Sequence, residues 1–197
     1  MKIIIGLTGP TGAGKSSAAK LCEKLGLSLI DCDKVARQAV EKGTDGLKAL
    51  CTAFSDKILN PDGTLNRKKL ASIAFASPDK TQLLNDTTFP FIKELVLKGT
   101  EKGNTLLDAP TLFESGIDEI CFKTVAVLCE KQIRKARIMK RDNLTEEEAL
   151  LRMNAGKDDA FYIKNADYII YNNSGEVEFL NQFEATLTEI LKLGENL

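Results

Sequence analysis

Short apolar runs alternate with amphipathic stretches along the beginning and the end of the chain. Such runs predict buried strands, and the stretches between them favour helices. The predicted strands cover residues 3–7, 27–30, 105–108, 124–128 and 168–171. Helices are predicted over residues 17–25, 34–41, 130–141, 145–155 and 176–193. This alternation predicts an α/β fold with a parallel sheet covered on both faces, and ligands then bind beyond the carboxyl ends of the strands.

Residues 34–103 interrupt the alternation. They carry helical signals over 46–54, 67–75 and 80–98, and they contain no clear strand. About 70 residues is far more than a plain crossover between two strands needs. We therefore expect a helical insertion that carries substrate contacts.

A glycine-rich segment joins the first predicted strand to the first predicted helix. Residues 9–16, called the phosphate loop below, fit the pattern G-x-x-x-x-G-K-[ST]. Glycines allow backbone amides to approach an anion closely, Lys15 can reach the β- and γ-phosphates, and the Ser16 hydroxyl can ligate Mg²⁺. A glycine turn that merely joins two elements is the alternative. The pattern predicts a nucleotide phosphate site made by Gly12, Ala13, Gly14, Lys15, Ser16 and Ser17.

Composition narrows the possible chemistry. The 197 residues contain no histidine, which excludes a histidine base and histidine metal ligands and makes a carboxylate the leading candidate for a proton acceptor. The net charge of −1 gives no reason to expect a nucleic-acid partner. No apolar run approaches the ~20 residues that cross a bilayer, so no membrane association is expected. Five cysteines without a C-x-x-C pair are typical of reduced thiols in a cytoplasmic protein.

Three aspartates follow predicted strands. Asp31 and Asp33 come after the second strand at a spacing of two, which places them on the same side if the chain stays extended. There they could orient a substrate hydroxyl or hold Mg²⁺ through water, although one of them could simply cap the next helix. Asp108 ends the third strand, where it could serve the outer shell of the metal or form a turn before Ala109-Pro110. Glu114 could provide a further polar contact or a helix cap.

The helix predicted over residues 130–141 is strongly basic. Many of its charges are expected to form a solvated face, but Arg134, Arg137 and Arg141 share one side because they lie three and four residues apart. A guanidinium that closes over developing negative charge favours phosphoryl transfer. Arg141 is our preferred candidate for an arginine on a mobile lid.

An ordered set of motifs extends over nearly the whole chain and resembles the dephospho-coenzyme A kinase family. Its members are Gly6-Leu7-Thr8-Gly9, Ile30-Asp31-Cys32-Asp33 with Ala36-Arg37, Gly63-Thr64-Leu65-Asn66-Arg67-Lys68-Lys69-Leu70, Ala109-Pro110-Thr111-Leu112-Phe113-Glu114-Ser115-Gly116, Gln132 with Arg137 and Arg141, Ala166-Asp167, and Asn172-Asn173. The phosphate loop alone would indicate only a superfamily, whereas this series is much more specific.

The resemblance implies a single P-loop kinase domain over residues 1–197. Its five-stranded sheet would have the order 2-3-1-4-5, with a coenzyme A-binding helical insertion at 34–103 and a lid at 140–157. The implied reaction is ATP- and Mg²⁺-dependent phosphorylation of the ribose 3′-hydroxyl of dephospho-coenzyme A. Asp33 would be the base or hydroxyl-orienting acid, with Lys15 and Arg141 also catalytic. Substrate contacts would come from Thr8, Asp31, Asp33, Arg67 and Asp108.

The chain departs from the family pattern at several positions. Phe89 stands where the family usually has histidine, Asn66 where it has aspartate, and Gly156 where it has glutamine. These three positions belong to the acceptor or lid side.

Two other functions fit the same loop. The chain could be another small-molecule P-loop kinase that acts on a nucleotide or nucleoside, or a nucleotide-dependent switch that transfers nothing. The sequence lacks the Asn-Lys-x-Asp guanine motif, which counts against a GTPase switch. We expect a monomer or a weak homo-oligomer with a small-molecule substrate as its partner.

Overall fold

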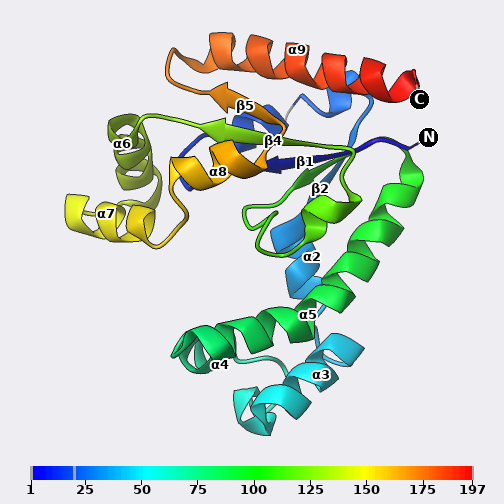
Figure 1. Ribbon diagram of the computed structural model, residues 1–197. Helices are drawn as coiled ribbons and strands as arrows, with labels where there is room; N and C mark the ends of the chain where they lie inside the picture. Colours follow the sequence, from blue (N-terminus) through cyan, green and yellow to red (C-terminus); the bar gives the residue numbers. More distant parts are fainter. Residues whose placement is uncertain (1, 20, 197) are drawn as a thin grey trace. The chain divides into compact units, whose positions relative to one another are not determined.

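The computed structural model describes residues 2–19 and 21–196 (Figure 1). Within them lies a five-stranded parallel sheet in the order β2-β3-β1-β4-β5, as the resemblance implied. Its strands are β1 (Ile4–Thr8), β2 (Ser28–Asp31), β3 (Thr105–Asp108), β4 (Lys123–Leu128) and β5 (Tyr168–Tyr171). β1 pairs with β3 on one side and with β4 on the other. The central strand therefore leads directly into the phosphate loop at the carboxyl edge of the sheet.

The chain forms two compact units. The first contains the chain up to Ile30 and from Lys102 onward, and the second comprises Asp31–Glu101. Helices of the first unit are α1 (Lys15–Ala19), α6 (Lys131–Asp142), α7 (Glu146–Asn154), α8 (Asp159–Asn165) and α9 (Glu176–Glu195). Short 3-10 helices are η1 (Glu23–Leu25) and η4 (Ile117–Ile120) in the first unit, η2 (Asp56–Ile58) in the second, and η3 (Thr100–Lys102) at the boundary.

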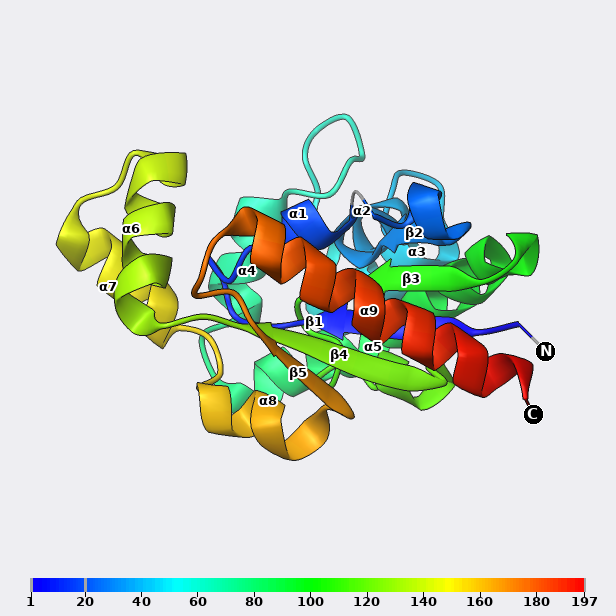
Figure 2. The same ribbon diagram turned by 90° about the horizontal axis from the view of Figure 1, so that it is seen from above.

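Alternating residues of the strands cover the two faces of the sheet in the first unit. Val125 and Val127 pack with the α9 side chains of Phe179 and Phe183. The intervening residues of β4 pack against Tyr162 of α8 on the other face. Figures 1 and 2 show α9 and α8 on opposite faces of the strands. Burial on both faces is why the strands read as continuous apolar runs in the sequence.

The second unit is helical. Its helices are α2 (Cys32–Gln38), α3 (Asp45–Phe54), α4 (Arg67–Ala74) and α5 (Pro78–Gly99). α5 packs against the other three helices of the unit and continues through Pro90. The helical signals over residues 80–98 therefore belong to one continuous helix. Among the described residues, no helix is both long enough and apolar enough to cross a membrane.

Two helices differ from the sequence-based expectation. The helix predicted over residues 17–25 is interrupted: α1 ends at Ala19, and the chain continues through a turn into η1. Lys20, which that prediction included, lies outside the described residues. Helix α8 was not predicted, because it has only seven residues and only Tyr162 of it is fully buried. Its first turn is capped by Asp158, whose carboxylate accepts a hydrogen bond from the Phe161 amide.

A cluster of hydrogen bonds around Asp167 joins the starts of β4 and β5. The Asp167 carboxylate accepts hydrogen bonds of 2.8 Å from the Lys123 ammonium and from both the amide and the hydroxyl of Thr124. Burial favours the neutral acid, but these hydrogen bonds outweigh it and lower the pKa of Asp167 below its usual value of 3.8.

Asp167→Asn is expected to lower the free energy of unfolding at neutral pH and to flatten its acid dependence. Because the pKa is depressed in the folded state, the stabilisation is full above the ordinary pKa and is lost as the pH falls through the folded value. Urea unfolding at neutral pH and at about pH 3 measures this difference. Asp79→Asn, at an exposed position of α5, is the matched control. An acid dependence of unfolding that is the same in Asp167→Asn and the unsubstituted protein would contradict the assignment.

Candidate active site

The phosphate loop adopts a conformation that needs glycine at fixed positions. Gly9, Gly12 and Gly14 have φ values of +136°, +80° and +98°, which side-chain-bearing residues rarely adopt. There is also no room for a side chain at these positions, because a Cβ at Gly9 would lie 2.2 Å from the Val127 carbonyl oxygen. A Cβ at Gly14 would lie 2.3 Å from the Asn172 side-chain nitrogen. The loop therefore packs directly against the β4 backbone and the Asn172 side chain.

Gly9→Ala is expected to lower the melting temperature by several degrees and to abolish nucleotide binding. Strained backbone costs about 1–3 kcal/mol, and the contact with the Val127 carbonyl adds to it. Gly103→Ala is the matched control, since Gly103 has a φ of +141° but no atom within 4 Å of its would-be Cβ. Thermal unfolding and titration with MgADP measure both variants. Equal effects in the two would show that the close approach to β4 is unimportant.

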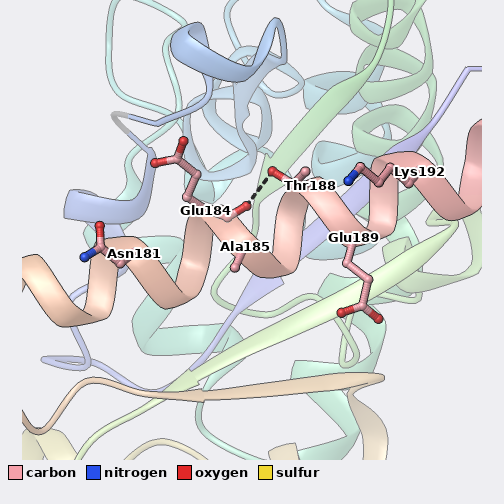
Figure 3. A pocket seen from close by; sticks show the side chains of 6 residues that line it. All are labelled: Asn181, Glu184, Ala185, Thr188, Glu189 and Lys192. Carbon is pink, nitrogen blue, oxygen red and sulfur yellow. Dashed lines mark hydrogen bonds between the residues drawn. The ribbon is translucent and has the colours of Figure 1, made fainter.

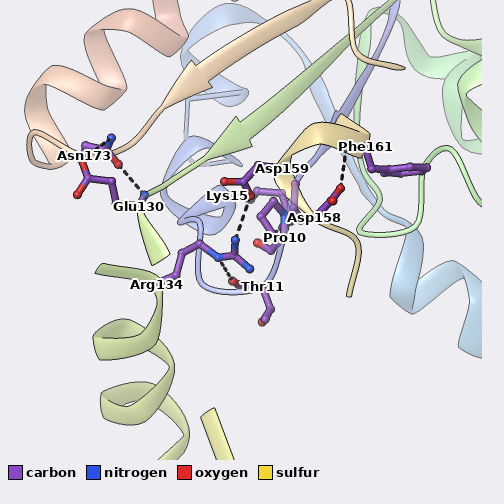
Figure 4. Close-up of polar contacts among 10 residues, drawn as sticks. Pro10, Thr11, Lys15, Glu130, Arg134, Asp158, Asp159, Phe161 and Asn173 are labelled. Carbon is purple, nitrogen blue, oxygen red and sulfur yellow. Dashed lines mark hydrogen bonds and ion pairs between the residues drawn. The ribbon is translucent and has the colours of Figure 1, made fainter. Parts of the chain in front are cut away.

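Two carbonyl groups of the loop are anchored to the body of the first unit. The Thr11 carbonyl accepts a hydrogen bond of 3.2 Å from Nε of Arg134 (Figure 4). The Ala13 carbonyl accepts from an Arg137 guanidinium nitrogen at 3.3 Å and from the Asn172 amide at 2.9 Å. In a planar trans peptide the next N–H points opposite to the carbonyl. Anchoring these carbonyls therefore turns the amides of Gly12 and Gly14 away from their anchors, the arrangement that favours an anion.

The lysine of the motif lies at the loop. Lys15 begins α1, and its ammonium group donates hydrogen bonds to the carbonyls of Gly9 at 2.6 Å and Pro10 at 3.4 Å. Phosphate oxygens would offer this ammonium stronger, charge-assisted hydrogen bonds. The next residue, Ser16, is exposed. A cation and an accessible hydroxyl are thus placed together after the glycines.

Thr8 and Asp108 end neighbouring strands. Thr8 is fully buried at the end of β1, and its hydroxyl donates to the Pro110 carbonyl at 3.3 Å. Asp108 ends β3 opposite Leu7. Burial raises the pKa of the Cys22 thiol to about 11, and the negative charge of Asp108 adds to that effect. The carboxylate thus lies at the carboxyl edge of the sheet, beside the strand that leads into the loop.

The arginines of α6 make two different kinds of contact. Arg134 and Arg137 reach the phosphate loop, as described above. Arg141 instead donates from two guanidinium nitrogens to the two carboxylate oxygens of Asp142, each at 2.8 Å. Asp142 also accepts from Arg152 of α7 at 2.8 Å. The lid role of Arg141 remains a prediction, whereas Arg134 and Arg137 already contact the loop.

Comparison with known proteins assigns the family. A family model described as dephospho-CoA kinase matches residues 3–178. The chain belongs to the dephospho-CoA kinase family. A family member from Listeria monocytogenes is 41% identical over 177 residues, which cover 86% of this chain and 88% of that protein. The resemblance inferred from the ordered motifs is therefore confirmed.

Solved structures agree with the family assignment. A protein from Thermus thermophilus superposes with a TM-score of 0.80 at 30% identity, covering 95% of this chain and 97% of that one. Dephospho-CoA kinase from Campylobacter jejuni superposes with a TM-score of 0.69 at 28% identity, covering 98% and 100% of the two chains.

In the second unit, the two aspartates that match a family motif have different surroundings. Asp31 caps α2, because its carboxylate accepts a hydrogen bond of 3.0 Å from the Lys34 amide. The helix begins at Cys32, so the extended geometry that would place both aspartates on one side does not form. Asp33 instead lies exposed in the first helical turn. Capping is thus assigned to Asp31, and the catalytic role of Asp33 remains a prediction.

Another family motif in the second unit forms the start of α4. Arg67 is the first residue of this helix and donates to the Arg37 carbonyl at 3.2 Å. Asn66 caps the helix by accepting from the Lys69 amide at 3.0 Å. Asparagine caps a helix about as well as aspartate does, so the departure from the family pattern at residue 66 preserves this local function. Substrate contact by Arg67 remains a prediction.

Glu114, which belongs to another family motif, has one deeply buried oxygen. This Oε2 atom has no hydrogen-bond partner among the described residues. Burial raises the pKa of Tyr162 to about 12, with a further contribution from the negative charge of Glu114. The acid therefore faces the α8 side of the sheet.

An open hollow on α9 is a poor alternative site for phosphate (Figure 3). Its lining comes from this one helix and consists of Asn181, Glu184, Ala185, Thr188, Glu189 and Lys192. Glu184 is paired with Lys24, and Glu189 accepts a hydrogen bond from Tyr168. Two carboxylates and no glycine loop make this surface unfavourable for an anion.

Sequence reasoning did not identify the anchors of the loop. Asp159 was not considered in the sequence analysis, and Arg134 was noted only for its position on the predicted basic helix. Arg137 and Asn172 appeared there as members of the family motifs, but neither was given a role at the loop. One signal was present: Arg134 and Arg137 lie three residues apart on one side of a helix. Their burial against the loop depends on the fold, so the spacing alone could not separate them from a solvated basic face.

Proposed function

We propose that this chain transfers the γ-phosphoryl group of ATP to the ribose 3′-hydroxyl of dephospho-CoA and thereby makes coenzyme A, in the last step of its biosynthesis. The family assignment supports the reaction class and the acceptor. The single observation that carries the phosphate half of the proposal is the anchoring of the Thr11 and Ala13 carbonyls. This anchoring turns the Gly12 and Gly14 amides away from their anchors, and the Lys15 ammonium lies at the same loop.

The loop residues bind the β- and γ-phosphates in this proposal. Amides of Gly12 and Gly14 donate to phosphate oxygens, and Lys15 moves from the loop carbonyls to the phosphates. Because the peptides that carry these amides are anchored before the nucleotide arrives, the amides need little reorganisation when charge develops on the transferred group. Arg141 leaves Asp142 and adds a further positive charge from the lid.

The oxygen donors of the first unit are of the kind that Mg²⁺ prefers, but the protein would supply only some of its ligands. In the described parts of the chain, no group of three or more acidic or cysteine residues could hold a metal ion without the nucleotide. The Ser16 hydroxyl would provide one ligand, the phosphates others, and Asp108 would hold ligating water, an oxygen set that Mg²⁺ prefers. When bound, Mg²⁺ neutralises charge on the phosphates.

Asp33 orients the acceptor in the same proposal. It follows β2, and in parallel sheets ligands bind beyond the carboxyl ends of the strands. The chain has no histidine, so a carboxylate is suited to accept or orient the hydroxyl proton. Asp31, Thr8 and Arg67 complete the proposed acceptor side. The insertion at 34–103 would bind the coenzyme A portion, and 140–157 would form the lid.

A side-by-side comparison of acceptors tests the proposal. Dephospho-CoA, nucleosides and nucleoside monophosphates are each supplied with ATP and Mg²⁺, and kcat/KM is measured for each. Dephospho-CoA is expected to be the preferred acceptor by a wide margin. Preference for a nucleoside or nucleotide would contradict the proposed activity and indicate another small-molecule kinase. ATP hydrolysis that is independent of every acceptor would favour a nucleotide-dependent switch.

A further inference from the structure

We propose that Arg134 and Asp159 form a positioning pair that aims the Gly12 amide at the bound phosphate. In this proposal Arg134 acts through the Thr11 carbonyl and does not touch the nucleotide. The inference rests on the proposed phosphate-binding role of the loop and adds a residue pair to it.

Arg134 is buried and bonded on two sides. Only 3% of the residue is exposed. Its Nε donates to the Thr11 carbonyl at 3.2 Å, and one terminal guanidinium nitrogen lies 3.1 Å from Asp159 Oδ1 (Figure 4). One guanidinium therefore bridges the phosphate loop and the start of α8.

Arg134 and Asp159 both belong to the fixed first turn of a helix. The amide of Glu130, just before α6, donates to the Asn173 side chain at 2.9 Å, and the Arg134 amide donates to the Glu130 carbonyl at 3.0 Å. Asp159 begins α8 directly after its capping residue, Asp158. The guanidinium is thus held in place by two element ends rather than by the loop it contacts.

The backbone of α6 also supports the loop at the same point. A Cβ at Gly12 would lie 3.0 Å from the Arg134 carbonyl and 2.9 Å from Cγ1 of Ile138. Gly12 therefore lies directly against the helix on one side. With the Thr11 carbonyl held by Arg134, the planar peptide that follows turns the Gly12 N–H away from that bond.

The ion pair with Asp159 determines which partners the Arg134 guanidinium can bind. A guanidinium already paired with a carboxylate has its charge largely compensated, and its planar fork serves two partners at once. Lysine carries the same charge but lacks the fork. Arginine in this place is therefore suited to hold a carbonyl in a fixed direction.

A direct phosphate ligand and a positioning pair predict opposite effects of Asp159→Asn. If Arg134 bound phosphate itself, removing the competing carboxylate would tighten nucleotide binding, and Arg134→Lys would retain much of it. If the pair positions the loop, Asp159→Asn weakens binding, and Arg134→Lys is as damaging as Arg134→Gln. The sign of the Asp159→Asn effect therefore separates the two roles.

The test measures MgADP binding by calorimetry without any acceptor. We expect Asp159→Asn to weaken binding by about threefold to tenfold, and both Arg134 variants to weaken it by about tenfold or more. Lys131→Gln is the matched control, because it removes an exposed positive charge from the same helix. Thermal unfolding of each variant without nucleotide verifies that it is folded.

The NMR chemical shifts of the loop amide protons distinguish a positioning role from a purely structural one, which would not affect the Gly12 amide selectively. On addition of MgADP, the Gly12 amide of Asp159→Asn should shift less than in the unsubstituted protein. The Gly14 amide should shift as before, since its preceding carbonyl is held by Arg137 and Asn172. Equal changes at both glycines would contradict the proposal.

The other outcomes are also decisive. Tighter or unchanged MgADP binding by Asp159→Asn would contradict the proposal that Arg134 and Asp159 position the loop. Failure of the unsubstituted protein to phosphorylate dephospho-CoA, with MgADP binding and the Gly12 effect intact, would overturn the proposed function alone. Absence of MgADP binding in the unsubstituted protein would overturn both.

Discussion

Lys15→Ala is expected to lower kcat/KM for ATP by about 10²–10³-fold while the fold is retained. The substitution removes the ammonium group that lies at the phosphate loop, where it donates to the Gly9 carbonyl. The positive charge of Lys15 is needed most when negative charge develops on the transferred phosphoryl group, so kcat should fall together with kcat/KM.

Steady-state kinetics with varied ATP measure this effect. Lys24→Ala is the control, because it removes a lysine from the same unit that is exposed and paired with Glu184. Exposed ion pairs contribute little, so this variant should retain its activity. A Lys15→Ala protein with kcat/KM within a factor of a few of the original would refute the role of the loop lysine.

Asp33→Asn is expected to reduce kcat by about 10²–10⁴-fold with little change in the KM for ATP. An amide retains the size of the side chain but cannot accept the hydroxyl proton. Because Asp33 is exposed in the first turn of α2, the substitution should leave the fold unchanged.

Asp45→Asn is the matched control for this experiment. Asp45 is also an exposed acid in the first turn of a helix of the same unit, so both variants lose a favourable charge at a helix start. Only Asp33→Asn should lose turnover. Comparable activity of the two variants would show that Asp33 neither accepts nor orients the proton.

Most of the fold could be predicted from local sequence. The strand at residues 105–108 and the one at 168–171 coincide with β3 and β5, because strands buried on both faces appear as uninterrupted apolar runs. The order of the strands could not be derived this way, since hydrophobic periodicity carries no information on which strands pair. It came from the family resemblance. Helix α8 escaped prediction because seven residues are too few for a helical periodicity.

The candidate site could be predicted only where the chemistry needs a local motif. Glycines, lysine and serine must follow one another closely to surround a phosphate, so residues 9–16 were identifiable. The anchors of the loop come from α6 and from Asn172 beyond β5. They act on backbone carbonyls, so their residue types do not indicate this role, although Arg137 and Asn172 belong to the family motifs. Asp31 and Asp33 show a different limit, because their relative direction depends on where α2 begins.

The most direct test of the central claim is to identify the product formed from ATP, Mg²⁺ and dephospho-CoA. Mass spectrometry and phosphorus NMR of the purified product are expected to show one added phosphate, attached to the ribose 3′-hydroxyl. Consumption of ATP without a phosphorylated acceptor, or a phosphate attached at any other position, would contradict the account.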